Sequence, residues 1–276
     1  MLTIGTGGVA VVTGAAGGIG LGMARAGAKR GMSVMLVDLD EARVAEAAAG
    51  LAATGARTSY RAIDVTDPDA MEQLAADVMA EFGRVDVVFL NAGIAAVSPI
   101  TEMSLEDWHR VMDVDINSVF YGVRAFLPHM TEQGFGHLNA TASANAWRGD
   151  VFQASYIAAK HAVVALMESV VLDLRALEIP VGASVLSPGP IATDLMKRSI
   201  SGDEEDLEEG HEMLNQGMDP DRAGRVTLDA IAEARFWIFT HDAIFKTIRE
   251  RMEHVLGDGA LPPDLDWDWE ELFATS

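Results

Sequence analysis

The sequence predicts a single-domain α/β protein, residues 1–276, with a doubly wound parallel sheet and helices on both faces. Short runs of β-branched and other apolar residues alternate with longer stretches of helical period from residue 9 to about residue 195. Several of these runs are apolar almost throughout, as parallel strands buried on both faces require. The 276 residues are 49% hydrophobic, which is enough for one buried core.

Six apolar runs predict the strands, and six segments of helical period predict the helices. The strands are expected at Val9–Thr13, Val34–Asp38, Thr58–Ile63, Val85–Asn91, Gly136–Ser143 and Val181–Ser187. The helices are expected at Ile19–Arg30, Glu41–Ala53, Pro68–Phe82, Leu105–Met130, Phe152–Leu177 and Thr227–Phe239. Because strands and helices alternate, the connections are crossovers between parallel strands.

The composition argues against several classes of partner. A count of 20 Lys and Arg against 42 Asp and Glu gives a formal net charge of −22, which repels nucleic acid and anionic membrane surfaces. No run reaches the roughly 18 to 20 apolar residues of a membrane span, and no basic segment precedes the first apolar run. We therefore expect a cytoplasmic protein. With no Cys and no metal-ligand spacing among its seven His residues, neither a disulfide nor a metal site is expected.

A glycine-rich turn follows the first predicted strand and opens the first helix. In residues 14–20 (GAAGGIG), backbone amides and the positive helix end can approach a pyrophosphate where a Cβ atom would collide. Asp38 ends the second predicted strand, where a carboxylate accepts hydrogen bonds from the adenosine ribose and repels the 2′-phosphate of NADP. NAD is therefore the expected cofactor. The alternative is that Asp38 only caps a helix, although Asp40 is better placed to cap the helix at Glu41.

Further motifs follow this turn in order. They are Asp64-Val65, Asn91-Ala92-Gly93, Asn117, Ser143, Tyr156 with Lys160 four residues later, and residues 188–193 (PGPIAT). Together with Thr13, Gly14, Gly18 and Gly20 in a T-G-x-x-x-G-x-G turn, they resemble the short-chain dehydrogenase/reductase family, NAD-dependent type. The chain departs from the family at Asn139-Ala140, in the strand before the serine, and at Gly27 in the first helix, where an apolar residue is usual.

The resemblance implies a Rossmann-like fold and assigns the cofactor contacts. Asp64 and Val65 would bracket the adenine, Asn91 to Gly93 would line the cleft, and Thr193 would hold the nicotinamide carboxamide. The whole expected set is Gly14, Gly18, Ile19, Gly20, Asp38, Asp64, Val65, Asn91, Ala92, Gly93, Tyr156, Lys160, Pro188, Gly189, Ile191 and Thr193.

Tyr156 and Lys160 are expected on one face of a helix, because residues four apart are neighbours there. A phenol has a pKa of about 10 in water, and we expect the Lys160 ammonium and an oxidised nicotinamide to lower it, so that Tyr156 acts as acid and base. Ser143 ends its strand at the carboxyl edge of the sheet, where its hydroxyl would orient the substrate oxygen. The family resemblance makes Asn117 a water-holding link from Lys160 to solvent.

The substrate pocket is expected beside these catalytic groups. Ser143, Asn145, Trp147 and Met196 would line it, and its mostly apolar character favours a hydrophobic or aryl substrate. Trp147 packing within a loop is an equally weighted alternative. The sequence thus predicts an oxidoreductase that transfers a hydride between NAD(H) and a secondary alcohol or ketone. The competing hypotheses are an NAD-binding regulatory or scaffold protein without turnover, and an epimerase or dehydratase.

Three regions carry expectations about motion and assembly. Residues 201–212 are rich in acids, which indicates a solvated loop or helix face, or a lid formed by residues 196–220 that closes over the substrate. The tail, residues 257–276, carries Trp267 and Trp269 and is expected to dock on its own or a neighbouring subunit. The helices at Leu105–Met130 and Phe152–Leu177 are apolar on more than one face, so a homodimer or homotetramer is expected.

Overall fold

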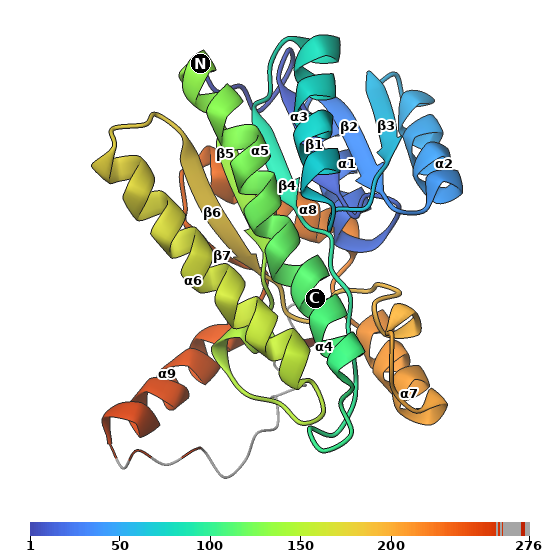
Figure 1. Cartoon of the computed structure of the whole chain (residues 1–276), viewed down its shortest axis with the longest axis vertical. Coiled ribbons are helices and arrows are strands. Elements are labelled where there is room, and N and C mark those ends of the chain that lie inside the picture. Colours follow the sequence, from blue (N-terminus) through green and yellow to red (C-terminus); the bar gives the residue numbers. More distant parts are fainter. Residues whose placement is uncertain (258, 260, 262–271, 274–276) are drawn as a thin grey trace.

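The computed structural model describes residues 1–257, 259, 261, 272 and 273. Its sheet has seven parallel strands in the order β3-β2-β1-β4-β5-β6-β7 (Figure 1). The strands are β1 (Val9–Thr13), β2 (Ser33–Asp38), β3 (Thr58–Ala62), β4 (Val87–Leu90), β5 (His137–Thr141), β6 (Gly182–Ser187) and β7 (Trp237–Phe239). All six predicted strands are confirmed, and the doubly wound fold with them.

The prediction of a helix at Thr227–Phe239 was wrong at both ends. Helix α8 spans Pro220–Ala232, with Asp219 as its N-cap and proline in its first turn. Ala234 then takes a positive φ of 56°, which ends the helical path. The next residues form β7, where Ile238 is buried and pairs with Leu186 of β6.

Helices cover both faces of the sheet and enclose two apolar layers (Figure 1). One layer lies between the sheet and α3 (Pro68–Phe82), α5 (Ser118–Gln133) and α6 (Ala154–Ala176), with Leu74, Phe126 and Met167 fully buried in it. The other lies against α1 (Gly18–Lys29), α2 (Glu41–Ala52) and α8. Burial on both faces explains why the strand runs are apolar throughout.

The helix predicted at Leu105–Met130 is divided by a π-helical segment. Helix α4 spans Leu105–Met112, the π segment spans Asp113–Asn117, and α5 continues from Ser118. Helix α6 begins two residues later than the predicted Phe152, because Phe152 has a positive φ of 59°. A π segment changes which residues share a helix face, and this one lies beside the site described below.

The acidic segment 201–212 is largely helical. Helix α7 spans Glu204–Asn215, after a short 3₁₀ turn at Met196–Arg198, and its acids are mostly exposed, as the solvated-face interpretation expects. Closure of residues 196–220 over a substrate stays a prediction. Helix α9 spans Ala243–Leu256, and the described tail residue Leu272 is buried against Ala144 and Ile244 of the same chain. Trp267 and Trp269 lie outside the described residues.

In the described part of the chain, no helix combines the length and apolarity that crossing a membrane requires.

Candidate active site

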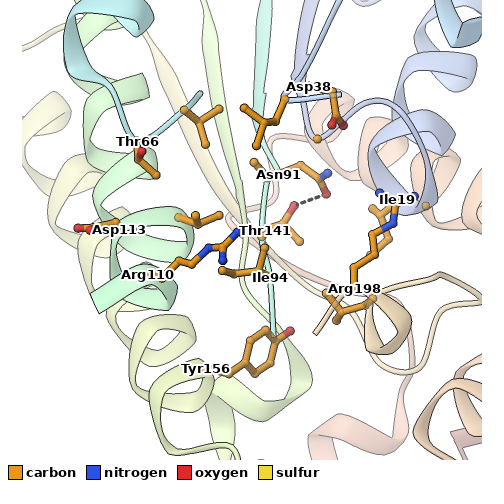
Figure 2. A pocket seen from close by; sticks show the side chains of 18 of the residues that line it. Ile19, Asp38, Thr66, Asn91, Ile94, Arg110, Asp113, Thr141, Tyr156 and Arg198 are labelled. Carbon is orange, nitrogen blue, oxygen red and sulfur yellow. Dashed lines mark hydrogen bonds between the residues drawn. The ribbon is translucent and has the colours of Figure 1, made fainter. Parts of the chain in front are cut away.

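A cleft of about 870 Å³ opens at the carboxyl ends of the strands, and most of the predicted site residues line it (Figure 2). It lies where the chain changes direction in the sheet: β2 and β3 follow β1 on one side, and β4 continues on the other. Doubly wound proteins bind ligands at this switch point because the loops from the two sides separate there.

The glycine turn forms one wall of the cleft with its backbone. A Cβ atom on Gly20 would lie 2.2 Å from the Gly14 carbonyl oxygen, so only glycine lets the turn fold back on itself. Gly18 has a φ of +52° and packs against Thr193. Gly17 is the N-cap of α1, and no side chain caps its first amides. This arrangement fits the pyrophosphate of a dinucleotide, since the free amides and the helix dipole favour an anion.

Asp38 lies at one end of the cleft (Figure 2). Its carboxylate accepts hydrogen bonds from the amides of Ala16 (3.0 Å) and Asp40 (3.3 Å), which fix its direction. The N-cap of α2 is Asp40, whose side chain accepts from the Arg43 amide. The alternative that Asp38 is only a helix cap is therefore wrong.

The structure brings thirteen of the sixteen predicted cofactor residues to this cleft. They are Gly14, Gly18, Ile19, Asp38, Asp64, Val65, Asn91, Ala92, Gly93, Tyr156, Lys160, Pro188 and Thr193. The other three lie behind the lining. Gly20 supports the glycine turn, the Gly189 amide donates to Thr240, and Ile191 is buried against Met218 and Ala223.

Tyr156 projects from α6 at the end of the cleft opposite Asp38 (Figure 2), and Lys160, on the same helix, also lines the cleft. Lys160 Nζ lies 5.5 Å from the centre of the Tyr156 ring and donates to the Thr141 carbonyl at 3.0 Å. A hydrogen bond joins the hydroxyls of Ser143 and Tyr156, and Ser143 Oγ also accepts from the Asn145 amide. Three of the four groups predicted for catalysis are thus brought together.

The structure does not bring Asn117 to this group, and its role as a water-holding link stays a prediction. Its amide donates to the Asp113 carboxylate at 2.7 Å, and it is not part of the cleft lining. Asp115, from the same π segment, reaches Lys160 instead: its Oδ2 lies 3.0 Å from Lys160 Nζ. The π segment places Asp115 on the buried side of the helix, between the buried residues Val111 and Val119.

The pKa of Tyr156 is raised by its protein surroundings as a whole, although Lys160 acts to lower it, as expected. The expected contribution of an oxidised nicotinamide stays a prediction. Burial raises the pKa of this phenol, Lys160 lowers it, Asp115 raises it, and the hydrogen bond from Ser143 lowers it. Burial is the largest single influence on Lys160 and acts to lower its pKa, but Asp115 and Tyr156 together outweigh it, so the pKa is above that of a free lysine. Lys160 is therefore an ammonium inside the protein.

The predicted substrate residues around Ser143 have other partners. Trp147 donates from its indole to Ser187 at 3.0 Å and packs on Phe239, so its alternative role within a loop is the observed one. Asn145 donates to Gln153, and Met196 packs against α7 at Gly210. The residues that line the cleft but were not predicted to do so include Ile94, Arg110, Val114, Thr141 and Arg198.

Asp115 is the residue whose importance the sequence analysis missed. A signal was present: Asp115 stands four residues from both Val111 and Val119, two apolar residues of the helix predicted at Leu105–Met130. A carboxylate on an apolar helix face needs a cation inside the protein. The described residues hold no cluster of His, Cys, Asp and Glu suited to a metal ion, and Lys160 is that cation.

The doubly wound sheet, the glycine turn and the paired Tyr156 and Lys160 define a dinucleotide-binding oxidoreductase. Residues 8–204 match the family described as short chain dehydrogenase, and the chain belongs to the short-chain dehydrogenase/reductase family. A 1-deoxy-11-beta-hydroxypentalenate dehydrogenase from Streptomyces exfoliatus is 34% identical over 262 residues, which cover 92% of this chain and 90% of that protein.

Two crystal structures show the fold with a nucleotide bound. A short-chain dehydrogenase/reductase from Burkholderia phymatum in complex with NAD has a TM-score of 0.90 and 32% identity, covering 96% of this chain and 100% of that one. An alcohol dehydrogenase from the archaeon Thermococcus sibiricus, complexed with 5-hydroxy-NADP, has a TM-score of 0.72 and 26% identity, covering 84% and 95%.

Proposed function

We propose that the protein transfers a hydride between NAD(H) and a secondary alcohol or ketone that carries a hydrophobic or aryl group. The observation that carries this proposal is that Tyr156 and Lys160 line the nucleotide cleft together, while Ser143, which is not among the lining residues, hydrogen-bonds Tyr156. A regulatory or scaffold protein without turnover has no need of a phenol, an ammonium and a hydroxyl placed together. The retained trio therefore favours an enzyme.

Asp38 supports NAD over NADP. Its carboxylate lines the cleft where the second strand ends, and two backbone amides hold it there. A negative charge in this position accepts the ribose hydroxyls of NAD and repels the additional phosphate of NADP. Arg198 lines the cleft beside Ile19, close to the glycine turn, where a guanidinium suits the pyrophosphate that both cofactors share (Figure 2).

At the end of the cleft opposite Asp38, each catalytic residue has a separate role in the reaction. When bound in the cleft, NAD⁺ would supply the acceptor for the hydride that leaves the carbon of the alcohol. Tyr156 takes the hydroxyl proton during oxidation and returns it during reduction. Ser143 orients the substrate oxygen through its hydroxyl, which is already hydrogen-bonded to Tyr156. Lys160 holds a positive charge beside the phenol and supports the deprotonated form that oxidation requires.

The surroundings of Tyr156 support a hydrophobic substrate. Tyr156 belongs to an apolar cluster with the buried residues Ala96, Val111 and Ala159, and Ile94 packs against this cluster. A substrate oxygen that reaches Tyr156 therefore brings its carbon substituents into an apolar environment. A polyol in the same place would lose its hydrogen bonds to water.

The substitution Tyr156→Phe tests this function directly. We expect kcat to fall at least about a hundredfold, since the ring remains and only the proton-transferring oxygen is lost. NAD binding, measured by calorimetry, should change little. Tyr60→Phe, on the exposed edge strand β3, is the matched control and should keep wild-type turnover. More than a tenth of wild-type kcat in Tyr156→Phe argues for another base.

Cofactor choice is tested with Asp38→Ala. The wild-type protein should use NAD at least about ten times better than NADP, and the variant should narrow this ratio because the repulsion of the 2′-phosphate is gone. Steady-state kcat/KM with both cofactors measures the ratio. An equal or better kcat/KM with NADP in the wild-type protein contradicts the assignment.

We also propose that the protein is a homodimer or homotetramer. Phe120 on α5 and Leu172 on α6 are 49% and 60% exposed although both are large and apolar. The two helices lie side by side on one face of the sheet, so these side chains suit a two-fold interface (Figure 1). Sedimentation at micromolar concentration tests this, and a monomer contradicts it.

A further inference from the structure

Asp115 and Lys160 form an ion pair inside the protein. The exposed fractions of their side chains are 0% and 4%, and Asp115 Oδ2 lies 3.0 Å from Lys160 Nζ. Asp115 Oδ1 accepts the Ile94 amide at 2.8 Å, which fixes the carboxylate to the loop that follows β4. Within the described part of the chain, Oδ2 makes no further hydrogen bond. The charge of this oxygen is therefore directed at Lys160.

Two local features make room for this pair. The π segment Asp113–Asn117 turns Asp115 toward α6 and leaves Asp113 exposed. Gly93 supplies the space, because a Cβ atom there would lie 3.2 Å from both Asp115 Oδ2 and Lys160 Nζ. The contact thus depends on the backbone of two separate segments.

We propose that Asp115 is a positioning residue for the reaction, a proposal that rests on the function proposed above. Its carboxylate fixes the Lys160 ammonium beside Tyr156 and partly cancels the positive charge that Lys160 presents to the phenol. Tyr156 consequently keeps its proton to higher pH than it would beside an unpaired lysine. Oxidation of an alcohol should therefore require more alkaline conditions than reduction of a ketone.

The charges around Tyr156 agree with this assignment. Burial is the main cause that raises the pKa of Tyr156, Lys160 lowers it, and Asp115 raises it further. The pKa of Asp115 is itself raised, by burial first, and Lys160 and the Ile94 amide act in the opposite direction. Asp115, Lys160 and Tyr156 thus each respond to the charges of the other two, so their titrations are coupled.

The other charged side chains that line the cleft from α4 and the π segment are exposed, unlike the buried Asp115. They are Glu106, His109, Arg110 and Asp113. From α6, His161 binds the Ile157 carbonyl and Arg251. The groups that pack against the pair from β4, β5 and the loop after β4 are neutral: Asn91, Thr141 and the backbone of Ile94. Asp115 is therefore the carboxylate whose removal should change the Tyr156 titration.

The test is the pH dependence of kcat/KM for alcohol oxidation in Asp115→Asn. An asparagine keeps the oxygen that accepts the Ile94 amide but removes the charge, so the midpoint of the profile should move toward lower pH by about one unit. Asp115→Glu, which restores a carboxylate, should return the midpoint toward the wild-type value. Asp107→Asn removes an acid from α4 that lies outside the cleft and should leave the profile unchanged.

A second readout needs neither substrate nor cofactor. The chain has only three tyrosines, so ring-labelled tyrosine gives three NMR signals, and Tyr156→Phe identifies one of them. The Tyr156 signal should titrate at lower pH in Asp115→Asn than in the wild-type protein. A purely structural role for Asp115 moves neither this titration nor the rate profile.

The outcomes separate this inference from the proposed function. If the wild-type protein oxidises alcohols through Tyr156 but Asp115→Asn has an unchanged or more alkaline profile, the inference is overturned and the function stands. If no alcohol or ketone is turned over, the function fails, and the tyrosine titration still decides the inference. Should Asp115→Asn not fold, labelled aspartate in the wild-type protein decides it, because a protonated Asp115 at neutral pH overturns the proposal.

Discussion

Two buried aspartates at opposite ends of β4 show how one kind of side chain serves structure in one place and chemistry in another. Asp86 precedes the strand and accepts four hydrogen bonds: from the amides of Thr3 (2.8 Å) and Val9 (2.9 Å), and from Arg84 Nε (2.8 Å) and Nη2 (2.6 Å). Asp115 lies beyond the other end, beside a buried lysine. Both carboxylates have no exposed surface.

The difference lies in how completely each charge is satisfied. Both oxygens of Asp86 are saturated by the backbone and by a guanidinium that itself reaches solvent, so nothing remains to interact with a ligand. One oxygen of Asp115 faces a single ammonium at the wall of a cleft. A saturated buried charge stabilises a fold, whereas a partly satisfied one leaves its field available to a neighbouring reactive group.

The largest expected effect is that of Asp86→Ala on stability. The substitution leaves the buried Val9 amide and the Thr3 amide without an acceptor and takes the partner from Arg84, so the free energy of unfolding should fall by about 3 to 5 kcal/mol. Urea denaturation measures this loss. The pH profile of turnover in the folded variant should match the wild-type profile. A shifted profile would contradict the conclusion that Asp86 serves stability while Asp115 serves the reaction.

The next largest effect is a loss of stability at acidic pH, and its source lies at the end of the sheet where Asp86 lies. His137, the first residue of β5, donates its amide to the Asp86 carbonyl and contacts Ser184 Oγ through Nε2. Burial lowers the pKa of His137 from 6.5 to about 4. The unfolded chain therefore binds a proton more readily than the folded one, and stability is lost as the pH falls from 6.5 to about 4.

This loss should amount to about 3 kcal/mol and should be absent from His137→Gln, whose amide does not titrate. Denaturation at a series of pH values measures it. His241, near the carboxyl edge, also has a pKa lowered to about 4, by burial first and then by the charge of Arg222. Some acid sensitivity should therefore remain in His137→Gln, and His241→Gln is its counterpart. If His137→Gln loses as much stability at acidic pH as the wild-type protein, His137 is not the source of that loss.

Local patterns predicted the strands and the nucleotide turn, because apolar runs and glycine spacing depend on neighbours in sequence. They failed where the geometry depends on distant contacts. Helical spacing places Asp115 on the apolar face with Val111 and Val119, but it does not reveal that Lys160, on a separate helix, is the partner of Asp115. Strand β7 has three residues, which are too few to show a strand pattern in the sequence. It forms because Ile238 pairs with Leu186 of β6. Trp147 was predicted to line the substrate pocket, but its indole donates to Ser187 and its ring packs on Phe239.

The smallest expected effect is on the free energy of unfolding, and it is found by comparing two glycines of α1. Gly27 lies toward the amino end of the sheet, and Gly22 lies toward the carboxyl end. A Cβ atom on Gly27 would meet Val34, Ala10 and Met32 at 3.7 to 3.8 Å, which is ordinary contact.

Gly27→Ala should therefore raise the free energy of unfolding by about 0.5 to 1 kcal/mol, because alanine loses less backbone entropy in a helix and fills apolar space. Gly22→Ala is the matched control. Its Cβ atom would lie 2.0 Å from the Pro220 carbonyl oxygen, so α8 must move and stability should fall. Thermal and urea denaturation of both variants measure the difference. A destabilised Gly27→Ala would mean that the packing of α1 is as tight at the amino end as it is beside the cleft.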